Sequence, residues 1–514
     1  MGSRTRAMLL FTSVTLLLGA GFFALSVSGG GVFLSPDETA VAVAARFLGE
    51  HGTFRIAEPL VSDHSWLHPR SFVSTGDAMV PVGFLGMPFL MAGIWKLFGD
   101  AGFVLFTPLL ALSTVIPLWF ATTRWGRTGQ AATLVGWLTF PTVMLYANRG
   151  LFPNLPVLCL AIWASWLISR RGTASLVVAG SLTGLAILIR PTEIVWVGVW
   201  VGMAYLVSHP PKTWTLRRCV RDFIVVSAPF VAIAAIGACL AWMTYGSPLA
   251  IGYQLRDPST GPAIATAATQ VSWFESWAFG FHPRNVWFNA TSYLLTYLFP
   301  WAVLALVATV LAWKDAVERR WLYVAAWTVG VLCLIYGQGI YQDHVKADAV
   351  TLGNSFLRYL LPVAAIGALA LGRVAAWIER TVPRAGFTLA ILVVTLTASL
   401  GIWTATVRDD EGLTQDRIEL LRYASIRDDA VSVLDPSTIV LSDRSDKIFF
   451  PAFRVASPLP PRERIAELVD TVPGVAVFIR TLDEQTHASW VADGFELVPL
   501  IDAGNETLYR VTTF

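Results

Sequence analysis

Two adjacent carboxylates, Asp37 and Glu38, open the stretch PDETAVAVAARFLGEHG, which directly follows an apolar run. A carboxylate can take a proton from a hydroxyl or an amine when the two groups lie within hydrogen-bond reach. Asp before an apolar-periodic run is also a common helix cap, so Asp37 has a purely structural interpretation as well. The sequence therefore leaves two roles open for Asp37, general base or cap, and makes Glu38 the second candidate base.

Cationic side chains recur where apolar segments end. A guanidinium stays charged and donates two parallel bonds to a phosphate, whereas an arginine at a helix end can also simply extend toward lipid headgroups. Both interpretations remain open for each arginine taken alone. The residues of interest, with the neighbours that share their motifs, are Arg149, Arg190, His282, Arg284, Arg358 and Tyr359.

The composition indicates which kind of chain must position these groups. The 514 residues have a mean hydropathy of +0.60 and are only 14% charged, whereas soluble domains are about a quarter charged. Apolar stretches of about 20 residues are long enough to cross a bilayer as helices. The sequence predicts an all-α membrane protein of many spans, with the lipid bilayer as a partner. A net charge of +2 gives no reason to expect a nucleic acid partner.

Short basic connections such as 122–129, 209–222 and 314–320 are predicted to be cytoplasmic, and the longer, mixed loops 31–78, 245–291 and 339–357 external. This places the acids and arginines at the outer face, the N-terminus in the cytoplasm and the C-terminus outside. The apolar runs are 8–30, 79–98, 103–122, 130–147, 155–169, 174–190, 192–208, 223–244, 292–312, 321–338, 359–378 and 386–406.

One pair of these runs conflicts with the predicted sides. The loop 31–78 is outside and 122–129 inside, yet two apolar runs lie between them. The first, 79–98, contains Pro81 and Pro88, which disfavour a uniform helix. We therefore expect 79–122 to make one net crossing, which leaves eleven spans. The alternative is that one basic loop is an exception to the rule that basic loops lie in the cytoplasm. The first run, with its basic start, is predicted to be an uncleaved span rather than a cleaved signal peptide.

The composition changes after residue 406, which predicts a membrane domain over 1–406 and an extracytoplasmic domain over 407–514. The segments STIVLSD, VAVFIR, FELVPLI and TLYRVTTF have the pattern of strands, and PRERIAELVD and DEQTHASWVADG that of helices. Strands that alternate with helices indicate a small α/β domain. It has no nucleotide-binding or nucleophile motif, which favours a packing or docking domain without chemistry of its own.

With these motifs in order, the chain resembles the GT-C membrane glycosyltransferases, which use polyprenyl-phosphate-linked sugars. The likeness is greatest to the protein O-mannosyltransferase and aminoarabinose-transferase type and covers about residues 8–380. It rests on PDE in the first outer loop, the Pro-rich MVPVGFLGMPFLMAGIWKLFG, then GSLTGLAILIRPTEIV, TYGSPLAIGYQ and NSFLRYLLPV. Each motif is short, and their order carries more weight than any one of them. The resemblance also implies interfacial helices in the first outer loop, and we expect the amphipathic segment that follows the two acids to lie along the membrane interface.

The resemblance implies transfer of a sugar from a polyprenyl or dolichyl phosphate, such as a mannosyl donor, to a glycan, lipid or protein acceptor, with inversion. It implies that Asp37 is the base with Glu38 beside it, and that Arg190, Arg358 and Tyr359 bind the donor phosphate. The family often carries a second acid where this chain has Asn154, and an amide cannot act as a base. We therefore expect neither a two-acid mechanism nor a metal-binding pair at that position. The outer loops have no clear D-x-D motif, so a divalent metal is left open but not predicted, and the polyprenyl-phosphate sugar is a co-substrate rather than a cofactor.

Two other classes of function remain open. A transporter or flippase also has many spans, but its substrate site lies near the bilayer midplane in broken or charged helices; here the charges collect at span ends. A scaffold protein without catalysis is the third possibility. The abundance of arginine over lysine points to a prokaryotic plasma membrane as the location, in the cell envelope.

Overall fold

The computed structural model describes residues 13, 17–21, 30–170, 172–209, 215–255, 280–341, 343, 349–408 and 410–514. The predicted first span, 8–30, lies mostly outside the described residues. The chain divides into two compact units, which are treated separately below. The helical unit comprises Met1–Ser26, Val104–Gly237 and Ile264–Gln415, and the mixed unit comprises Val27–Phe103, Ala238–Ala263 and Asp416–Phe514.

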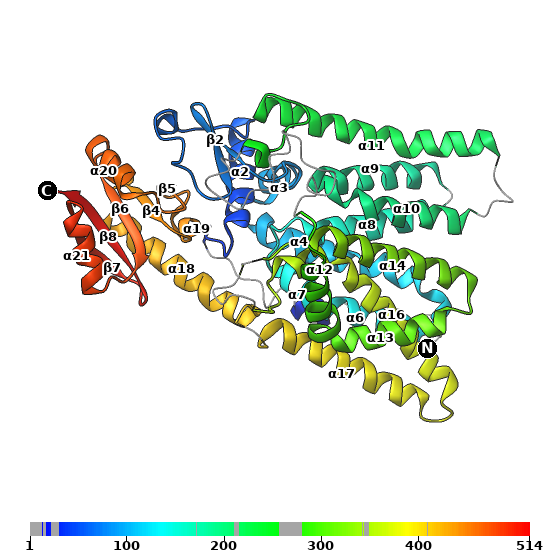
Figure 1. The fold of residues 1–514 in the computed structure, drawn as a ribbon. Coiled ribbons are helices and arrows are strands. Elements are labelled where there is room, and N and C mark those ends of the chain that lie inside the picture. Colours follow the sequence, from blue (N-terminus) through cyan, green and yellow to red (C-terminus); the bar gives the residue numbers. More distant parts are fainter. Residues whose placement is uncertain are drawn as a thin grey trace. The chain divides into compact units, whose positions relative to one another are not determined.

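The helical unit is built of long apolar helices joined by short helical turns (Figure 1). The elements that lie wholly or mostly in it are α4 (Ala101–Ser113), α5 (Val115–Ala121), η2 (Thr123–Trp125), α6 (Gly126–Leu138), α7 (Pro141–Asn148), α8 (Asn154–Ile168), α9 (Thr173–Ile189), η3 (Pro191–Glu193), α10 (Ile194–Ser208), α11 (Leu216–Tyr245), α12 (Pro283–Asn289), η7 (Ala290–Tyr297), α13 (Phe299–Ala312), α14 (Ala316–Tyr336), α15 (Ser355–Tyr359), α16 (Pro362–Thr381) and α17 (Gly386–Thr406).

Among the described residues, five helices are long and apolar enough to cross a membrane, or six if the bent pair Pro283–Tyr297 and Phe299–Ala312 forms one span. The predicted number of eleven spans therefore stays a prediction. The apolar run 130–147 is divided, because α6 ends at Leu138 and α7 begins at Pro141. Proline has no N–H to continue the preceding helix, which accounts for the break.

Small residues allow α6 and α16 to pack closely within the helical unit. A Cβ atom added to Gly129 would lie 3.1 Å from the carbonyl oxygen of Gly372, and one added to Gly136 would lie 3.2 Å from the Cα atom of Ala368. Side chains at these glycines would push the two backbones apart. Close approach through small residues is a common mode of helix association in membranes, where packing replaces the hydrophobic effect.

The mixed unit combines the first outer loop with the C-terminal segment. Its elements are α2 (Pro36–His51), β1 (Ile56–Ala57), η1 (Pro59–Ser62), β2 (Phe72–Thr75), β3 (Ala78–Pro81), α3 (Gly86–Phe98), η5 (Gly252–Leu255), α18 (Leu413–Val433), β4 (Ile439–Ser442), α19 (Asp446–Phe449), β5 (Arg454–Ala456), α20 (Arg462–Thr471), β6 (Val475–Arg480), α21 (Glu484–Ala492), β7 (Phe495–Asp502) and β8 (Glu506–Thr513).

The predicted irregularity of the run 79–98 is confirmed. Residues 78–81 form strand β3, and α3 has only 13 residues, which is roughly 20 Å of helix at 1.5 Å per residue. A hydrocarbon core of about 30 Å needs a longer helix, so α3 alone does not span it. Helix α3 packs instead against α2 in the mixed unit. The single net crossing of 79–122 stays a prediction.

Two sheets order the mixed unit. The first is antiparallel with the order β1-β3-β2, and the second has the order β5-β4-β6-β8-β7, in which β4 is parallel to both β5 and β6. All four predicted C-terminal strands are present as β4, β6, β7 and β8, and both predicted helices as α20 and α21. The three-residue strand β5 was not predicted.

The two segments of the mixed unit share one hydrophobic core. Ala40, Val43 and Phe72 of the first outer loop belong to the same buried cluster as Ile439 and Phe450 of the C-terminal segment. The rings of Phe72 and Phe450 are 5.3 Å apart, edge to face. The predicted division at residue 406/407 stays a prediction, but the residues before helix α3 pack with the C-terminal sheet rather than as a loop without a core.

Candidate functional site

Asp37 is presented by the first turn of α2 but does not cap that helix. The cap is Ser35, whose backbone is extended and whose hydroxyl accepts from the Asp37 backbone N–H at 3.2 Å, with Pro36 as the first helical residue. This pattern is a common helix start, because proline tolerates the first turn. The capping interpretation of Asp37 is therefore wrong, and the exposed Asp37 carboxylate accepts a hydrogen bond from the Ser71 hydroxyl at 2.8 Å.

Glu38 occupies a different environment from its neighbour. Its side chain is 4% exposed, whereas Asp37 is exposed. Helical geometry turns adjacent residues by about 100°, so the two carboxylates face different sides of α2. A base must reach a substrate, and the exposed Asp37 meets that requirement more directly than Glu38.

The rest of α2 is fixed by packing and by one ion pair. Arg46 binds Asp100 at 2.8 Å and lies over the ring of Phe103. Ala40 and Val43 of the same helix are buried in the mixed core. Our hypothesis that α2 lies along the membrane interface stays a prediction; what the structure shows is a helix anchored by one ion pair and by buried apolar side chains.

In the helical unit, the predicted arginines Arg149 and Arg358 converge on one aromatic ring. Their guanidinium carbons lie 4.9 Å and 4.3 Å from the centroid of Phe152, which is 4% exposed. Arg358 comes from the short helix α15, capped by the Asn354 side chain, and donates to the Ser355 hydroxyl at 2.9 Å. Two cations held over one ring suit the binding of an anion.

Tyr359 joins this pair of arginines to a third. Its ring stacks on that of Tyr336 at 4.2 Å and lies 5.0 Å from the Arg190 guanidinium and 5.5 Å from that of Arg358. The structure thus brings together Arg149, Arg190, Arg358 and Tyr359, which come from three separate predicted motifs. We call these residues with Phe152 and Tyr336 the arginine–tyrosine cluster.

Arg190 has a buried carboxylate partner. Its Nε donates to Glu193 Oε1 at 2.9 Å and its Nη2 to the Tyr336 hydroxyl at 3.2 Å, and Glu193 is 3% exposed. The Trp196 indole N–H also donates to Glu193. The charge of Arg190 is therefore compensated within the protein, which favours a role in holding Tyr336 and Tyr359 over direct binding of a phosphate.

This ion pair leads to a stability prediction. Glu193→Gln leaves Arg190 buried without its countercharge, and breaking one partner of a buried pair costs about 3–5 kcal/mol. We expect a clear fall in the thermal unfolding temperature of the purified protein in detergent. The control is Glu419→Gln, which breaks the half-exposed Arg422–Glu419 pair at the same spacing and should cost about 0–1 kcal/mol. An unchanged unfolding temperature in Glu193→Gln would contradict this structural role.

Tyr341 adds a hydroxyl beside the cluster. It donates to the Tyr336 carbonyl oxygen at 2.7 Å, and its ring lies 5.7 Å from that of Tyr359. Burial raises the pKa of the Tyr341 hydroxyl well above its usual value; the neighbouring tyrosines and Asp343 add to this, and Arg358 opposes it. Tyr341 is therefore a neutral hydrogen-bond donor at physiological pH and does not serve as a base.

The remaining predicted residues differ in their surroundings. Asn154 is the first residue of α8 and is 5% exposed, and its Oδ1 has no hydrogen-bond partner in the part of the chain that the structure describes. Such an atom carries an uncompensated desolvation cost. His282 and Arg284 are exposed at the start of α12. Within the described ranges, no hydrogen bond or ion pair links these two to the arginine–tyrosine cluster.

Several contributing residues were not predicted. Phe152 and Tyr336 complete the arginine–tyrosine cluster, Glu193 pairs with Arg190, and Ser71 binds Asp37. Glu193 follows Arg190 by three residues in IRPTE, a spacing that could have suggested an ion pair. Tyr336 lies inside an apolar run, where an aromatic residue ordinarily signals packing. Among the described residues, no group of three or more His, Cys, Asp or Glu side chains is placed to hold a metal ion.

Comparison with known proteins adds the fold-level context. No family model matches the chain, and no curated protein matches it. A solved structure does: the crystal structure of ArnT from Cupriavidus metallidurans bound to undecaprenyl phosphate, with a TM-score of 0.58 over 98% of this chain and 97% of that one, at 12% sequence identity. This chain has the fold of ArnT. The predicted fold class, a helical membrane protein with a small C-terminal sheet, is thereby confirmed.

Proposed function

We propose that this protein is an integral-membrane glycosyltransferase that moves one sugar from a polyprenyl-phosphate-linked donor to an acceptor at the extracytoplasmic face, with inversion. The observation that carries the proposal is the ArnT fold along nearly the whole chain, since that protein was crystallised with undecaprenyl phosphate. The acceptor belongs to the class of glycans, lipids or proteins. The proposed location is a plasma membrane, with the N-terminus cytoplasmic and the C-terminal segment extracytoplasmic.

The proposed reaction is a single displacement. Asp37 takes the proton from an acceptor hydroxyl or amine, and that acceptor atom forms a bond to the anomeric carbon of the donor sugar. The bond from this carbon to the phosphate oxygen breaks, and the oxygen keeps the electron pair. Attack from the side opposite the leaving group inverts the anomeric carbon. Polyprenyl phosphate and the glycosylated acceptor are the products.

Arg358 and Arg149 are assigned to the phosphate. Charge grows on the phosphate oxygens as the bond to the sugar breaks, and preorganised donors directed at that charge lower the barrier. Their contacts with Phe152 limit the side-chain freedom lost on binding. Tyr359 positions Arg358, and Arg190 supports Tyr359 from its other side. Asn154, with its unsatisfied Oδ1, is assigned to a donor hydroxyl rather than to proton transfer.

Lipid binding tests the donor class. The purified protein in nanodiscs is titrated with undecaprenyl phosphate and, separately, with undecaprenol, which has the same chain without the phosphate. We expect undecaprenyl phosphate to bind at least about tenfold more tightly, because charge-assisted hydrogen bonds contribute about 1.5–3 kcal/mol each. Equal affinity for both lipids would contradict the assignment of a phosphate site.

A further inference from the structure

The C-terminal sheet has an edge where ligands bind in many other folds. Strands β4 and β5 are parallel neighbours, and in open α/β sheets ligands bind beyond the carboxyl ends of such strands. Here that edge consists of residues 443–447 after β4 and Ser457 after β5. The Ser457 hydroxyl donates to the Asp443 carbonyl oxygen at 2.6 Å, which ties the two loops together.

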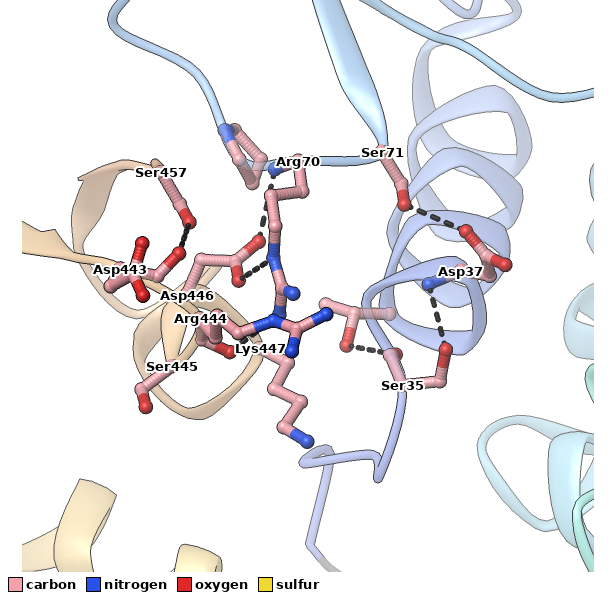
Figure 2. Close-up of polar contacts among 12 residues, drawn as sticks. Ser35, Asp37, Arg70, Ser71, Asp443, Arg444, Ser445, Asp446, Lys447 and Ser457 are labelled. Atoms are coloured by element: carbon pink, nitrogen blue, oxygen red, sulfur yellow. Dashed lines mark hydrogen bonds and ion pairs between the residues drawn. The ribbon is translucent and has the colours of Figure 1, made fainter. Parts of the chain in front are cut away.

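This edge binds the chain's own first outer loop. Asp446, only 1% exposed, accepts from the Arg70 backbone N–H at 3.0 Å and from Arg70 Nε at 2.8 Å. The Arg70 guanidinium also donates to the carbonyl oxygen of Arg444. Because main chain and side chain are held together, the position of residue 70 is fixed. The next residue is Ser71, which donates to Asp37, and Figure 2 shows the continuous line of contacts from Asp446 to Asp37.

A second contact fixes the other flank of Asp37. Lys447 Nζ donates to the carbonyl oxygen of Leu34 at 2.7 Å, one residue before the cap Ser35. The ammonium also lies 4.8 Å from the ring centroid of Tyr423 on α18. Two consecutive residues of α19, Asp446 and Lys447, thus hold the loop that carries Ser71 and the chain just before α2.

We infer that the C-terminal α/β domain is a positioning element for the Asp37 carboxylate, acting through Asp446 and Lys447. The inference rests on the proposed role of Asp37 as the base. A misplacement of about 1 Å in a reacting group can cost about 100-fold in rate, and groups on rigid, supported elements are held best. The domain that showed no catalytic motif in the sequence therefore contributes to catalysis by fixing where the base stands.

Lys447→Met tests the inference, because it removes the hydrogen bond to Leu34 and keeps the apolar stem of the side chain. We expect the turnover number to fall by about tenfold or more while the KM for the donor is unchanged, since the phosphate-binding residues are untouched. Lys447→Arg retains a donor and should restore much of the rate. Ser71→Ala, which removes the hydroxyl bonded to Asp37, should reproduce the loss.

The matched control is Arg454→Met. The Arg454–Glu58 ion pair, at 3.0 Å, also joins the C-terminal segment to the first outer loop, but neither residue touches Asp37, Ser71 or the chain before α2 in the described contacts. A purely structural role of the interface predicts equal effects of Lys447→Met and Arg454→Met. Our inference predicts a wild-type turnover number in Arg454→Met, and equal losses in both variants would overturn it.

Hydrogen exchange separates this inference from the proposed function. The backbone amides of 34–40 should exchange faster in Lys447→Met than in the wild type and should be unchanged in Arg454→Met. Unchanged exchange in Lys447→Met overturns the inference whether or not the protein is active. If the wild type releases no polyprenyl phosphate but amide exchange at 34–40 rises in Lys447→Met as expected, the proposed function fails. The positioning of the start of α2 by α19 is then still supported.

Discussion

Asp37→Asn lowers the turnover number by about 10²–10⁴-fold, the range by which general acid–base catalysis accelerates reactions. Asparagine has the same shape as aspartate, and its side-chain oxygen still accepts the Ser71 hydroxyl, so the start of α2 should keep its geometry. What is lost is the ability to take a proton. Donor binding should stay at the wild-type level, because the arginine–tyrosine cluster is unchanged.

The controls for Asp37→Asn come from the same segment. Asp63→Asn alters another exposed carboxylate of the first outer loop and should leave the rate unchanged. Glu38→Gln should have a smaller effect on the rate than Asp37→Asn, because Glu38 is buried. Turnover is followed as release of polyprenyl phosphate, and donor affinity by titration of the same preparations. Full activity in Asp37→Asn, with activity lost in Glu38→Gln, would move the base to Glu38.

Arg358→Ala weakens donor binding by about 10- to 150-fold, corresponding to about 1.5–3 kcal/mol for a charge-assisted hydrogen bond to phosphate. The guanidinium is in contact with the rings of Phe152 and Tyr359, which should limit the side-chain entropy lost when it binds an anion. Arg358→Lys keeps the charge but loses the planar group that donates two bonds. We expect the lysine variant to recover only part of the affinity.

Arg320→Ala is the control for Arg358→Ala, since Arg320 is exposed near the start of α14 in a loop predicted to be cytoplasmic. Affinity for undecaprenyl phosphate and the KM for the donor are measured in both variants. Arg320→Ala should bind like the wild type. If Arg358→Ala binds the lipid as tightly as Arg320→Ala does, the phosphate lies elsewhere and the assignment of Arg358 is wrong.

Local patterns predicted local structure well. Strands β4 and β6 were predictable because they are short apolar runs rich in β-branched residues, which is typical of buried strands, and β7 because it begins with alternating apolar and polar residues. The run 79–98 was recognisable as irregular from Pro81 and Pro88, and the structure places a strand and a short helix there. Strand β5 escaped prediction because its three residues, Arg454–Ala456, are too few to establish any period.

The contacts that give the site its form were not predictable from one sequence. Arg70 and Asp446 are 376 positions apart, and no local pattern connects them. The capping interpretation of Asp37 failed for a local reason, since Ser35 before Pro36 provides the better cap. Arg190 was expected to face a phosphate, and only the structure shows how completely Glu193 and Tyr336 surround its guanidinium.

Sugar transfer by the wild-type protein is the most direct test of the account. The protein is reconstituted in proteoliposomes with a panel of polyprenyl-phosphate sugars labelled in the sugar, and a membrane extract serves as acceptor. We predict that one donor yields free polyprenyl phosphate and labelled acceptor in equal amounts, with the anomeric configuration inverted. Movement of intact donor across the membrane, with no polyprenyl phosphate released from any member of the panel, would contradict the account and indicate a transporter.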